Sequence, residues 1–230
     1  MIFDTTSSTR VVNKFVKNLG EVHQYSKAEI KRTGEAATLK LNSYEWNFDI
    51  VPCFLTTETD NGTTYYLIPN GSGDWKKTDP RKDRLRLSLI NQSCNGRVLN
   101  VIRVLKAWNQ RRNKARIPSY LIETMISNYY EEQISFGKQD DVSYYIDIEI
   151  IRLLNYLRSV IYSVVPDPKK IAYDINDVGY DEKNSFYSRL CIDIEKADLA
   201  RKYESEGNEK EAIKKWQEIF GSDFPEYTGA

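Results

Sequence analysis

Apolar residues in the first part of the chain follow one helical spacing and then several strand spacings. A helix is expected over residues 11–19, ended by Gly20, and Met1-Ile2-Phe3 before it reads as the tail of a strand. Three further strands are expected, at residues 36–42, 46–55 and 63–68, the last after an Asp60-Asn61-Gly62 hairpin signal. The pattern predicts a helix packed on a small, largely antiparallel sheet, with Asp49 on its middle strand.

The second part of the chain has helical spacing almost throughout. Pro69 to Lys77 reads as a Gly/Ser loop, and Thr78-Asp79-Pro80 reads as the start of a helix. Further helices are expected at about residues 97–109, 120–130, 144–165, 181–206 and 209–220. The fold class is therefore predicted to be α+β, with a small sheet domain over residues 1–88 and a helical domain over residues 89–230.

Asp49 lies in an aromatic and β-branched run, where an unpartnered carboxylate is costly to bury. Strand alternation directs it to one face of the sheet, and a cleft is a better setting for it than a core. Two interpretations stay open from the pattern alone. Asp49 caps a turn before Pro52, or it is a metal-binding carboxylate on a catalytic sheet.

Charge and composition exclude several classes of function. Lys plus Arg and Asp plus Glu number 33 each, so no global field favours a nucleic-acid or membrane partner. Three widely spaced cysteines and the absence of a leader or a long apolar run indicate a reducing, cytoplasmic setting. The single histidine, His23, removes support from Ser-His, Cys-His and zinc chemistry. Carboxylates with a metal, or lysine with hydroxyls, would have to carry any catalysis.

Two places could bind phosphate groups. Lys106 lies late on one predicted helix and Ser119 at the start of the next, where an ammonium, a hydroxyl and a helix N-terminus could cradle an anion. The basic run at Lys76, Lys77, Arg81, Lys82, Arg84 and Arg86 could also hold phosphates, although such runs are more often solvated faces.

A set of motifs occurs in order along nearly the whole chain. They are Phe48-Asp49-Ile50-Val51-Pro52, Tyr66-Leu67-Ile68-Pro69, Trp75 with Thr78 and Pro80, Asn91, Ile102 to Asn109 with Lys106, Ser119-Tyr120, Pro166-Asp167-Pro168, Trp216 to Gly221 and Phe224-Pro225. The set resembles the SMODS-type cGAS/DncV-like nucleotidyltransferases (CD-NTases), bacterial synthases of cyclic di- and oligonucleotide messengers. The strand Asp and Val-Pro pair also occur in archaeal CCA-adding enzymes and oligoadenylate synthases, whereas the closing Trp and Phe-Gly element points to the SMODS branch.

The resemblance implies a polymerase-β-like palm followed by a helical domain that closes a nucleotide cleft. It implies that three palm carboxylates bind two Mg²⁺ (or Mn²⁺) ions, which activate a ribose hydroxyl for attack on an α-phosphate. Asp49 matches the third carboxylate, and Lys106 and Ser119 match positions that hold the donor triphosphate. Tyr120 is then expected near the base, and Asp167 either touches a base or caps its loop.

The sequence departs from the family where the first two metal ligands belong. The family has a Gly-Ser element and an Asp-x-Asp on an earlier strand, and neither occurs in these 230 residues. Met1-Ile2-Phe3 resembles the continuation of that strand, and Asp4 reads as a helix cap. One carboxylate cannot hold two magnesium ions, so we expect this chain to have lost an N-terminal segment and to have little or no catalysis by itself.

Three functions stay open on these grounds. The first is a magnesium-dependent synthase of a cyclic nucleotide from NTPs, which by resemblance serves antiphage (CBASS) defence beside regulator or effector proteins of its operon. The second is a catalytically dead relative that binds a nucleotide or a partner. The third is a CCA-type RNA nucleotidyltransferase, which needs a broad basic surface that the neutral chain disfavours. We expect no membrane contact and predict no DNA contact.

Overall fold

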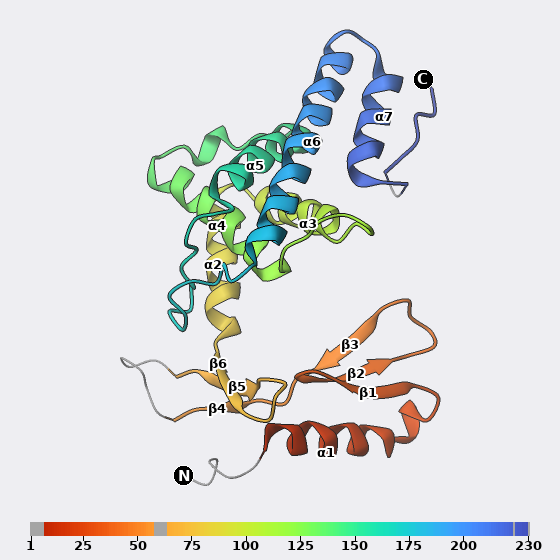
Figure 1. Ribbon diagram of the computed structural model, residues 1–230, viewed down its shortest axis with the longest axis vertical. Helices are drawn as coiled ribbons and strands as arrows, with labels where there is room; N and C mark the ends of the chain where they lie inside the picture. Colours follow the sequence, from red (N-terminus) through yellow and green to blue (C-terminus); the bar gives the residue numbers. More distant parts are fainter. Residues whose placement is uncertain (1–6, 58–63, 223, 230) are drawn as a thin grey trace. The chain divides into compact units, whose positions relative to one another are not determined.

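The computed structural model describes residues 7–57, 64–222 and 224–229. The expected strand at Met1–Phe3, the cap at Asp4 and the Asn61-Gly62 turn lie outside these ranges. The chain forms two compact units, Met1–Pro80 and Arg81–Ala230, and each is treated by itself (Figure 1). The boundary predicted between residues 88 and 89 falls inside helix α2 (Pro80–Ser93). Ile90 of that helix is buried in the core of the second unit, which explains why α2 belongs there.

The first unit begins with helix α1 (Ser8–Gly20), as predicted, and continues into a short 3-10 turn, η1 (His23–Tyr25). Strands β1 (Glu29–Thr33), β2 (Ala36–Lys40) and β3 (Asn47–Ile50) form an antiparallel sheet in that order. Val12 of α1 and Ala37 and Leu39 of β2 are buried, and α1 contacts β1 and β2. The predicted helix on an antiparallel sheet is therefore confirmed.

Two strand predictions in this unit are wrong. The sequence of β1 is polar and gave no strand signal, so β2 and not β3 is the middle strand of the described sheet. Asp49 therefore lies on an edge strand of the sheet formed by the described residues. The predicted strand over residues 46–55 is divided, because Pro52 lacks an N–H donor for a ladder. Its second piece, β4 (Phe54–Leu55), belongs to another sheet.

That second sheet pairs β4 with β5 (Tyr66–Pro69) and β5 with β6 (Trp75–Thr78), all antiparallel. The expected loop over residues 69–77 is thus partly wrong, because its end is a strand. The turn between β5 and β6 is held by the Asn70 side chain, whose Oδ1 accepts hydrogen bonds from the N–H groups of Ser72 (2.9 Å) and Asp74 (3.0 Å). Lys76 and Lys77 in β6 broke the apolar alternation that would have revealed the strand.

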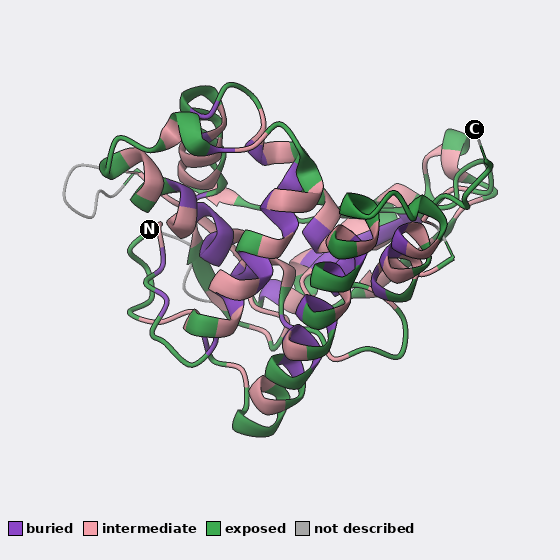
Figure 2. Ribbon diagram, turned by 90° about the horizontal axis from the view of Figure 1, so that it is seen from above, coloured by how far each residue is buried: buried purple, intermediate pink, exposed green. Residues whose placement is uncertain are grey.

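The second unit consists of six α-helices in the described residues. They are α2, α3 (Val98–Asn109), α4 (Ser119–Ser135), α5 (Ile146–Val160), α6 (Tyr180–Ser205) and α7 (Glu209–Phe220), with a short 3-10 turn η2 (Gln139–Asp141) before α5. The predicted helices are confirmed to within a few residues, except that α4 and α5 end five residues from the expected positions. Figure 2 shows their buried stretches as purple bands along helices that are otherwise pink and green.

Helices α6 and α7 form a hairpin that closes this unit (Figure 1). Gly207 between them has φ 74°, the left-handed conformation that glycine adopts without strain. At the far end of α7, Arg111 donates to the carbonyl groups of Glu218 and Ile219, the latter at 2.6 Å. Gly221 also has a positive φ, 94°, and a Cβ there would lie 3.1 Å from the Arg111 Nε. The Phe-Gly motif thus lets α7 end against an arginine from the loop after α3.

Candidate functional site

Asp49 is exposed on β3, and its neighbour across the ladder is Thr38 on β2. The Thr38 hydroxyl donates to Asp49 Oδ1 at 2.6 Å. Ala37 and Ile50 form the next register pair, and alternation places them on the opposite face of the sheet. The expectation that Asp49 avoids the core is confirmed. Its carboxylate bonds across the sheet to Thr38, and whether it binds a metal stays a prediction.

Lys106 lies near the end of α3, and its ammonium donates to Glu123 Oε2 on α4 at 2.7 Å. The lysine side chain is 37% exposed and the glutamate side chain 24% exposed. Lys106 is therefore partly accessible to solvent, and in this structure its ammonium is paired with the Glu123 carboxylate. Sequence reasoning missed Glu123, which lies four residues beyond Ser119.

Ser119 is the first residue of α4, as predicted, and its Oγ accepts a hydrogen bond from Gln110 Nε2 at 2.8 Å. Gln110 follows Lys106 by four residues and Glu123 follows Ser119 by four, so each pair falls on one side of its helix. The Lys106–Glu123 and Gln110–Ser119 contacts therefore lie side by side and link the end of α3 to the start of α4. The structure therefore places Lys106 and Ser119 along one seam, joined through partners that sequence reasoning missed.

The loop that leads into α4 is fixed by a buried asparagine. Asn109 donates from Nδ2 to the carbonyl of Ile117 at 2.8 Å, and its Oδ1 accepts from the Ile117 N–H at 3.2 Å. This two-way bond closes the loop over residues 110–116. An open pocket of about 390 Å³ adjoins it, lined by Gln110, Arg116, Ile117, Pro118, Ser119, Asp177, Val178 and Glu182. Ser119 thus borders open space at the N-terminus of α4, where anions are favoured.

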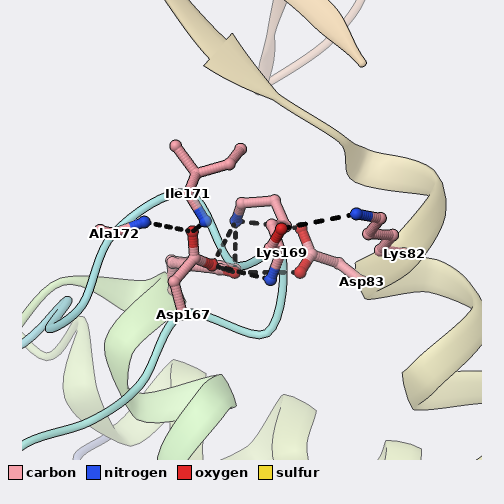
Figure 3. A network of polar contacts seen from close by, with 7 residues as sticks. Lys82, Asp83, Asp167, Lys169, Ile171 and Ala172 are labelled. Atoms are coloured by element: carbon pink, nitrogen blue, oxygen red, sulfur yellow. Dashed lines mark hydrogen bonds and ion pairs between the residues drawn. The ribbon is translucent and has the colours of Figure 1, made fainter. Parts of the chain in front are cut away.

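Tyr120, the second residue of α4, contacts a network of charged groups whose members Asp83, Asp167 and Lys169 are labelled in Figure 3. Its hydroxyl is 2.9 Å from Asp83 Oδ1 on α2 and 3.2 Å from Asp167 Oδ1, and it accepts a hydrogen bond from Lys169. Burial is the main cause that raises the pKa of Tyr120 far above its usual value, helped by the bond and charge of Asp83. The phenol therefore stays protonated and donates a hydrogen bond to a carboxylate.

Asp167 caps the loop that follows α5. Its carboxylate accepts from the backbone N–H groups of Lys169 (3.1 Å), Ile171 (3.2 Å) and Ala172 (3.3 Å). Burial alone would raise its pKa, but these bonds and the Lys169 ammonium stabilise the charged form, and the pKa lies below its ordinary value. Of the two predicted roles, the loop cap is what the structure shows, and contact with a base stays a prediction.

Asp83 and Lys169 complete the network, and sequence reasoning missed both. The Lys169 ammonium is 3.3 Å from Asp83 Oδ2 and 3.4 Å from Asp167 Oδ1. Lys82 also donates to the carbonyl of Lys169 at 3.5 Å. A Pro-Asp-Pro motif followed by Lys was the only signal in the sequence, and it did not reveal which helices the loop contacts. The structure brings Tyr120 and Asp167 together, whereas Asp49 belongs to the other unit.

A magnesium site does not form from the described residues alone. No three His, Cys, Asp or Glu side chains come together within residues 7–57, 64–222 and 224–229. Asp49 has the right chemistry for a hard cation, and within the described part of the chain its carboxylate bonds to the Thr38 hydroxyl. The residues present therefore do not fit the two-ion site that the motif resemblance implies. Nor does any described helix have the length and apolar character needed to cross a membrane.

Comparison with known proteins gives one strong sequence relative. The chain is 43% identical over 223 residues to a "probable cyclic nucleotide synthase" of Bacillus cereus (strain VD146). The match covers 97% of this chain and 65% of that protein, so the chain spans a little under two thirds of its relative's length. No family model matches the sequence.

Solved structures show the same fold at low sequence identity. CdnC of E. coli MS115-1, determined with ATP, has a TM-score of 0.70 and 14% identity over 94% of this chain and 72% of CdnC. Escherichia coli DncV, determined with 3′-deoxy GTP, has a TM-score of 0.69 and 15% identity over 94% of this chain and 58% of DncV. The predicted α+β class, a nucleotidyltransferase palm followed by helices, is therefore confirmed.

The sequence relative and the shared fold agree with the family that the ordered motifs indicate. The chain is a homologue of a protein named as a probable cyclic nucleotide synthase, and it has the fold of CdnC and DncV.

Proposed function

We propose that this chain serves as a nucleotidyltransferase that joins NTPs into a cyclic di- or oligonucleotide messenger. The observation that carries the proposal is the 43% identity, over 97% of the chain, to a protein named as a probable cyclic nucleotide synthase. The fold supports it, since CdnC was determined with ATP and DncV with 3′-deoxy GTP. In the proposed reaction a ribose hydroxyl gives up its proton to water and its oxygen bonds to an α-phosphorus. The bond from that phosphorus to the oxygen bridging to the β-phosphate breaks, and pyrophosphate leaves with that oxygen.

The seam between α3 and α4 is the proposed triphosphate site. Lys106 supplies a positive charge that is partly exposed, and Ser119 supplies a hydroxyl at the positive end of α4. A triphosphate there would replace Glu123 as the partner of Lys106 and Gln110 as the partner of Ser119. The proposed base position is beside Tyr120, one residue further along α4.

Asp49 is the proposed metal ligand of this chain. The expected cofactor, Mg²⁺ or Mn²⁺, would supply charge neutralisation and activation of the attacking hydroxyl when bound. Because the described residues bring together no set of three ligands, no step of the reaction is assigned to the metal here. We propose that the 230 residues bind NTPs but form little product until the remaining carboxylates are supplied.

The release of pyrophosphate tests nucleotidyl transfer as such. The 230-residue chain and a form extended at its N-terminus by about 60 to 100 residues, the rest of a typical small domain, are incubated with each NTP and Mg²⁺ or Mn²⁺. We expect release from the extended form, loss of release in its Asp49→Ala variant, and no loss in Asp74→Ala, an exposed carboxylate of the same unit. Pyrophosphate from Asp49→Ala at the unaltered rate would refute the assignment.

A catalytically dead nucleotide- or partner-binding relative is the second candidate, and the incomplete carboxylate set favours it. It predicts NTP binding by every form and pyrophosphate release by none. A CCA-type enzyme predicts label transfer from CTP or ATP to the 3′ end of tRNA, and the equal numbers of acidic and basic residues argue against it. The same incubations, with and without tRNA, separate the three candidates.

A role in antiphage defence, beside regulator or effector proteins of the same operon, rests on the family resemblance. Its test is the plating efficiency of phages on cells that carry the complete operon. We expect fewer plaques than on cells that carry the operon with Asp49→Ala. Equal plating efficiency on both strains would refute the defence role and leave the proposed nucleotidyl transfer untested by this experiment but not contradicted.

A further inference from the structure

Lys169 is the centre of the network around Tyr120. Its ammonium contacts three oxygens that come from three chain segments: Asp83 on α2, Tyr120 on α4 and Asp167 on its own loop (Figure 3). The side chain of Lys169 is only 12% exposed. Lys169 therefore joins the loop to both helices, together with the Tyr120 hydroxyl, which contacts Asp83 and Asp167.

The charges explain why a lysine is needed there. The Tyr120 phenol has one proton and can satisfy one carboxylate at a time, yet Asp83 and Asp167 both lie within 3.2 Å of it. Two carboxylates that share one donor repel each other unless a cation lies between them. Lys169 provides that cation, and without it the loop that carries Asp167 would be driven away from α2.

Lys169 also helps to hold the Tyr120 ring in place. Its ammonium bonds to the hydroxyl and lies 3.8 Å from the ring centroid. Asp83 and Asp167 contact the same hydroxyl. The ring is therefore held at its hydroxyl edge before any ligand arrives.

We propose that Lys169 is a positioning residue for the nucleobase: it holds the Tyr120 ring in a fixed place beside the base of an NTP. The inference rests on the proposed nucleotide site and adds to it a residue that the motif resemblance does not contain. It assigns Asp83 and Asp167 to the support of Tyr120 and leaves the triphosphate to Lys106 and Ser119.

The experiment compares two ligands by calorimetry, an NTP and inorganic tripolyphosphate, which has no base. In Lys169→Met we expect the Kd for the NTPs to rise about tenfold, because Tyr120 is no longer held in place for the base and part of the stacking free energy is lost, and the Kd for tripolyphosphate to stay unchanged. Lys169→Arg should retain most of the NTP affinity. Lys170→Met is the matched control, because Lys170 is exposed and its side chain makes no recorded polar contact within the described residues.

A second variant separates positioning from a general loss of structure. Asp83→Asn removes one of the two competing carboxylates, so in the Asp83→Asn/Lys169→Met double variant the loop should return toward α2. Hydrogen exchange at the amides of Lys169, Ile171 and Ala172, which bond to Asp167, reports the loop directly. We expect faster exchange in Lys169→Met and slower exchange again in the double variant.

Each outcome decides something different. Equal NTP affinity in the unaltered chain and Lys169→Met would overturn the positioning role and leave the proposed function standing. Equal losses for the NTP and for tripolyphosphate would also overturn it, because the base would then not be involved. No NTP binding by the unaltered chain, at any concentration tested, would overturn the proposed nucleotide site and this inference with it.

Discussion

The ammonium of Lys106 and the carboxylate of Glu123 are joined by a 2.7 Å hydrogen bond between α3 and α4. The proposed triphosphate site is therefore occupied by the protein's own anion. A polyphosphate has to displace Glu123 to reach Lys106, which costs part of its binding free energy. The Lys106–Glu123 pair should therefore lower the affinity of the seam between α3 and α4 for a polyphosphate.

Glu123→Gln should bind NTPs more tightly than the unaltered chain. An amide competes less strongly than a carboxylate for Lys106, and a partly exposed ion pair contributes up to about 1 kcal/mol, so we expect the Kd to fall by about threefold. Calorimetry measures the change. Glu132→Gln, an exposed glutamate of the same helix, is the control and should leave the Kd unaltered. Weaker binding in Glu123→Gln would show that Glu123 does not compete with the ligand.

Lys106→Met should weaken binding of both NTPs and tripolyphosphate by about tenfold, because both lose a charge-assisted hydrogen bond. The same variant should show a smaller dependence of Kd on salt between about 50 and 300 mM, since screening acts on the removed charge. Lys114→Met, in the exposed loop after α3, serves as the control. An unaltered salt dependence in Lys106→Met would place the phosphates elsewhere.

The buried pair of Arg189 and Asp193 on α6 should be essential for stability. Asp193 accepts from Trp108 Nε1 at 2.8 Å and from Arg189 Nε at 3.4 Å, and both members of the ion pair are at most 5% exposed. Asp193→Asn leaves a buried guanidinium without its counter-charge, and we expect a loss of about 3 kcal/mol in the free energy of unfolding.

Denaturation in urea measures this loss. Glu206→Gln is the control, because Glu206 forms an exposed pair with Lys202 at 3.9 Å, and it should change the free energy of unfolding by less than about 0.5 kcal/mol. Similar small effects in both variants would mean that the Trp108–Asp193–Arg189 network adds little to the fold.

Asp167 should contribute stability that depends on pH. Its pKa is lower in the folded protein than in the unfolded chain, so the unfolded chain binds more protons in the range between the two values. The contribution is therefore fully present above about pH 4 and is lost as the pH falls through the folded pKa.

The difference in unfolding free energy between the unaltered chain and Asp167→Asn should accordingly be largest near neutral pH and shrink below about pH 4. Asp198→Asn, at an exposed position of α6, is the control and should show no such trend. Urea denaturation at each pH measures the difference. A gap between the two proteins that stays constant with pH would contradict the assignment of the lowered pKa to the native loop.

The helices of the second unit could be predicted well because their apolar residues follow one period over long stretches. Positions such as Leu105, Ile122 and Leu157 are fully buried, as that period requires. The strands were harder. β1 has exposed, charged positions along its length, and its existence depends on pairing with β2 and not on its own sequence.

The candidate site could be predicted residue by residue but not as an arrangement. Lys106, Ser119 and Tyr120 stand out because of their motifs. Their partners Gln110, Glu123, Asp83 and Lys169 are ordinary charged or polar residues, up to 49 positions away in the chain. Such contacts form when helices and loops pack together, so they cannot be predicted from periodicity or local motifs.

The central claim is that the chain serves in the synthesis of a cyclic nucleotide. The most direct measurement uses NTPs labelled at the α-phosphate, the N-terminally extended chain with Mg²⁺ or Mn²⁺, and phosphatase treatment before chromatography. A cyclic product has no terminal phosphate, so phosphatase leaves its mobility unchanged, whereas a linear product loses its 5′-phosphates and migrates differently. We therefore predict a labelled species of unchanged mobility that disappears in Asp49→Ala. Only labelled species whose mobility phosphatase changes, or a species of unchanged mobility that survives in Asp49→Ala, would contradict the account.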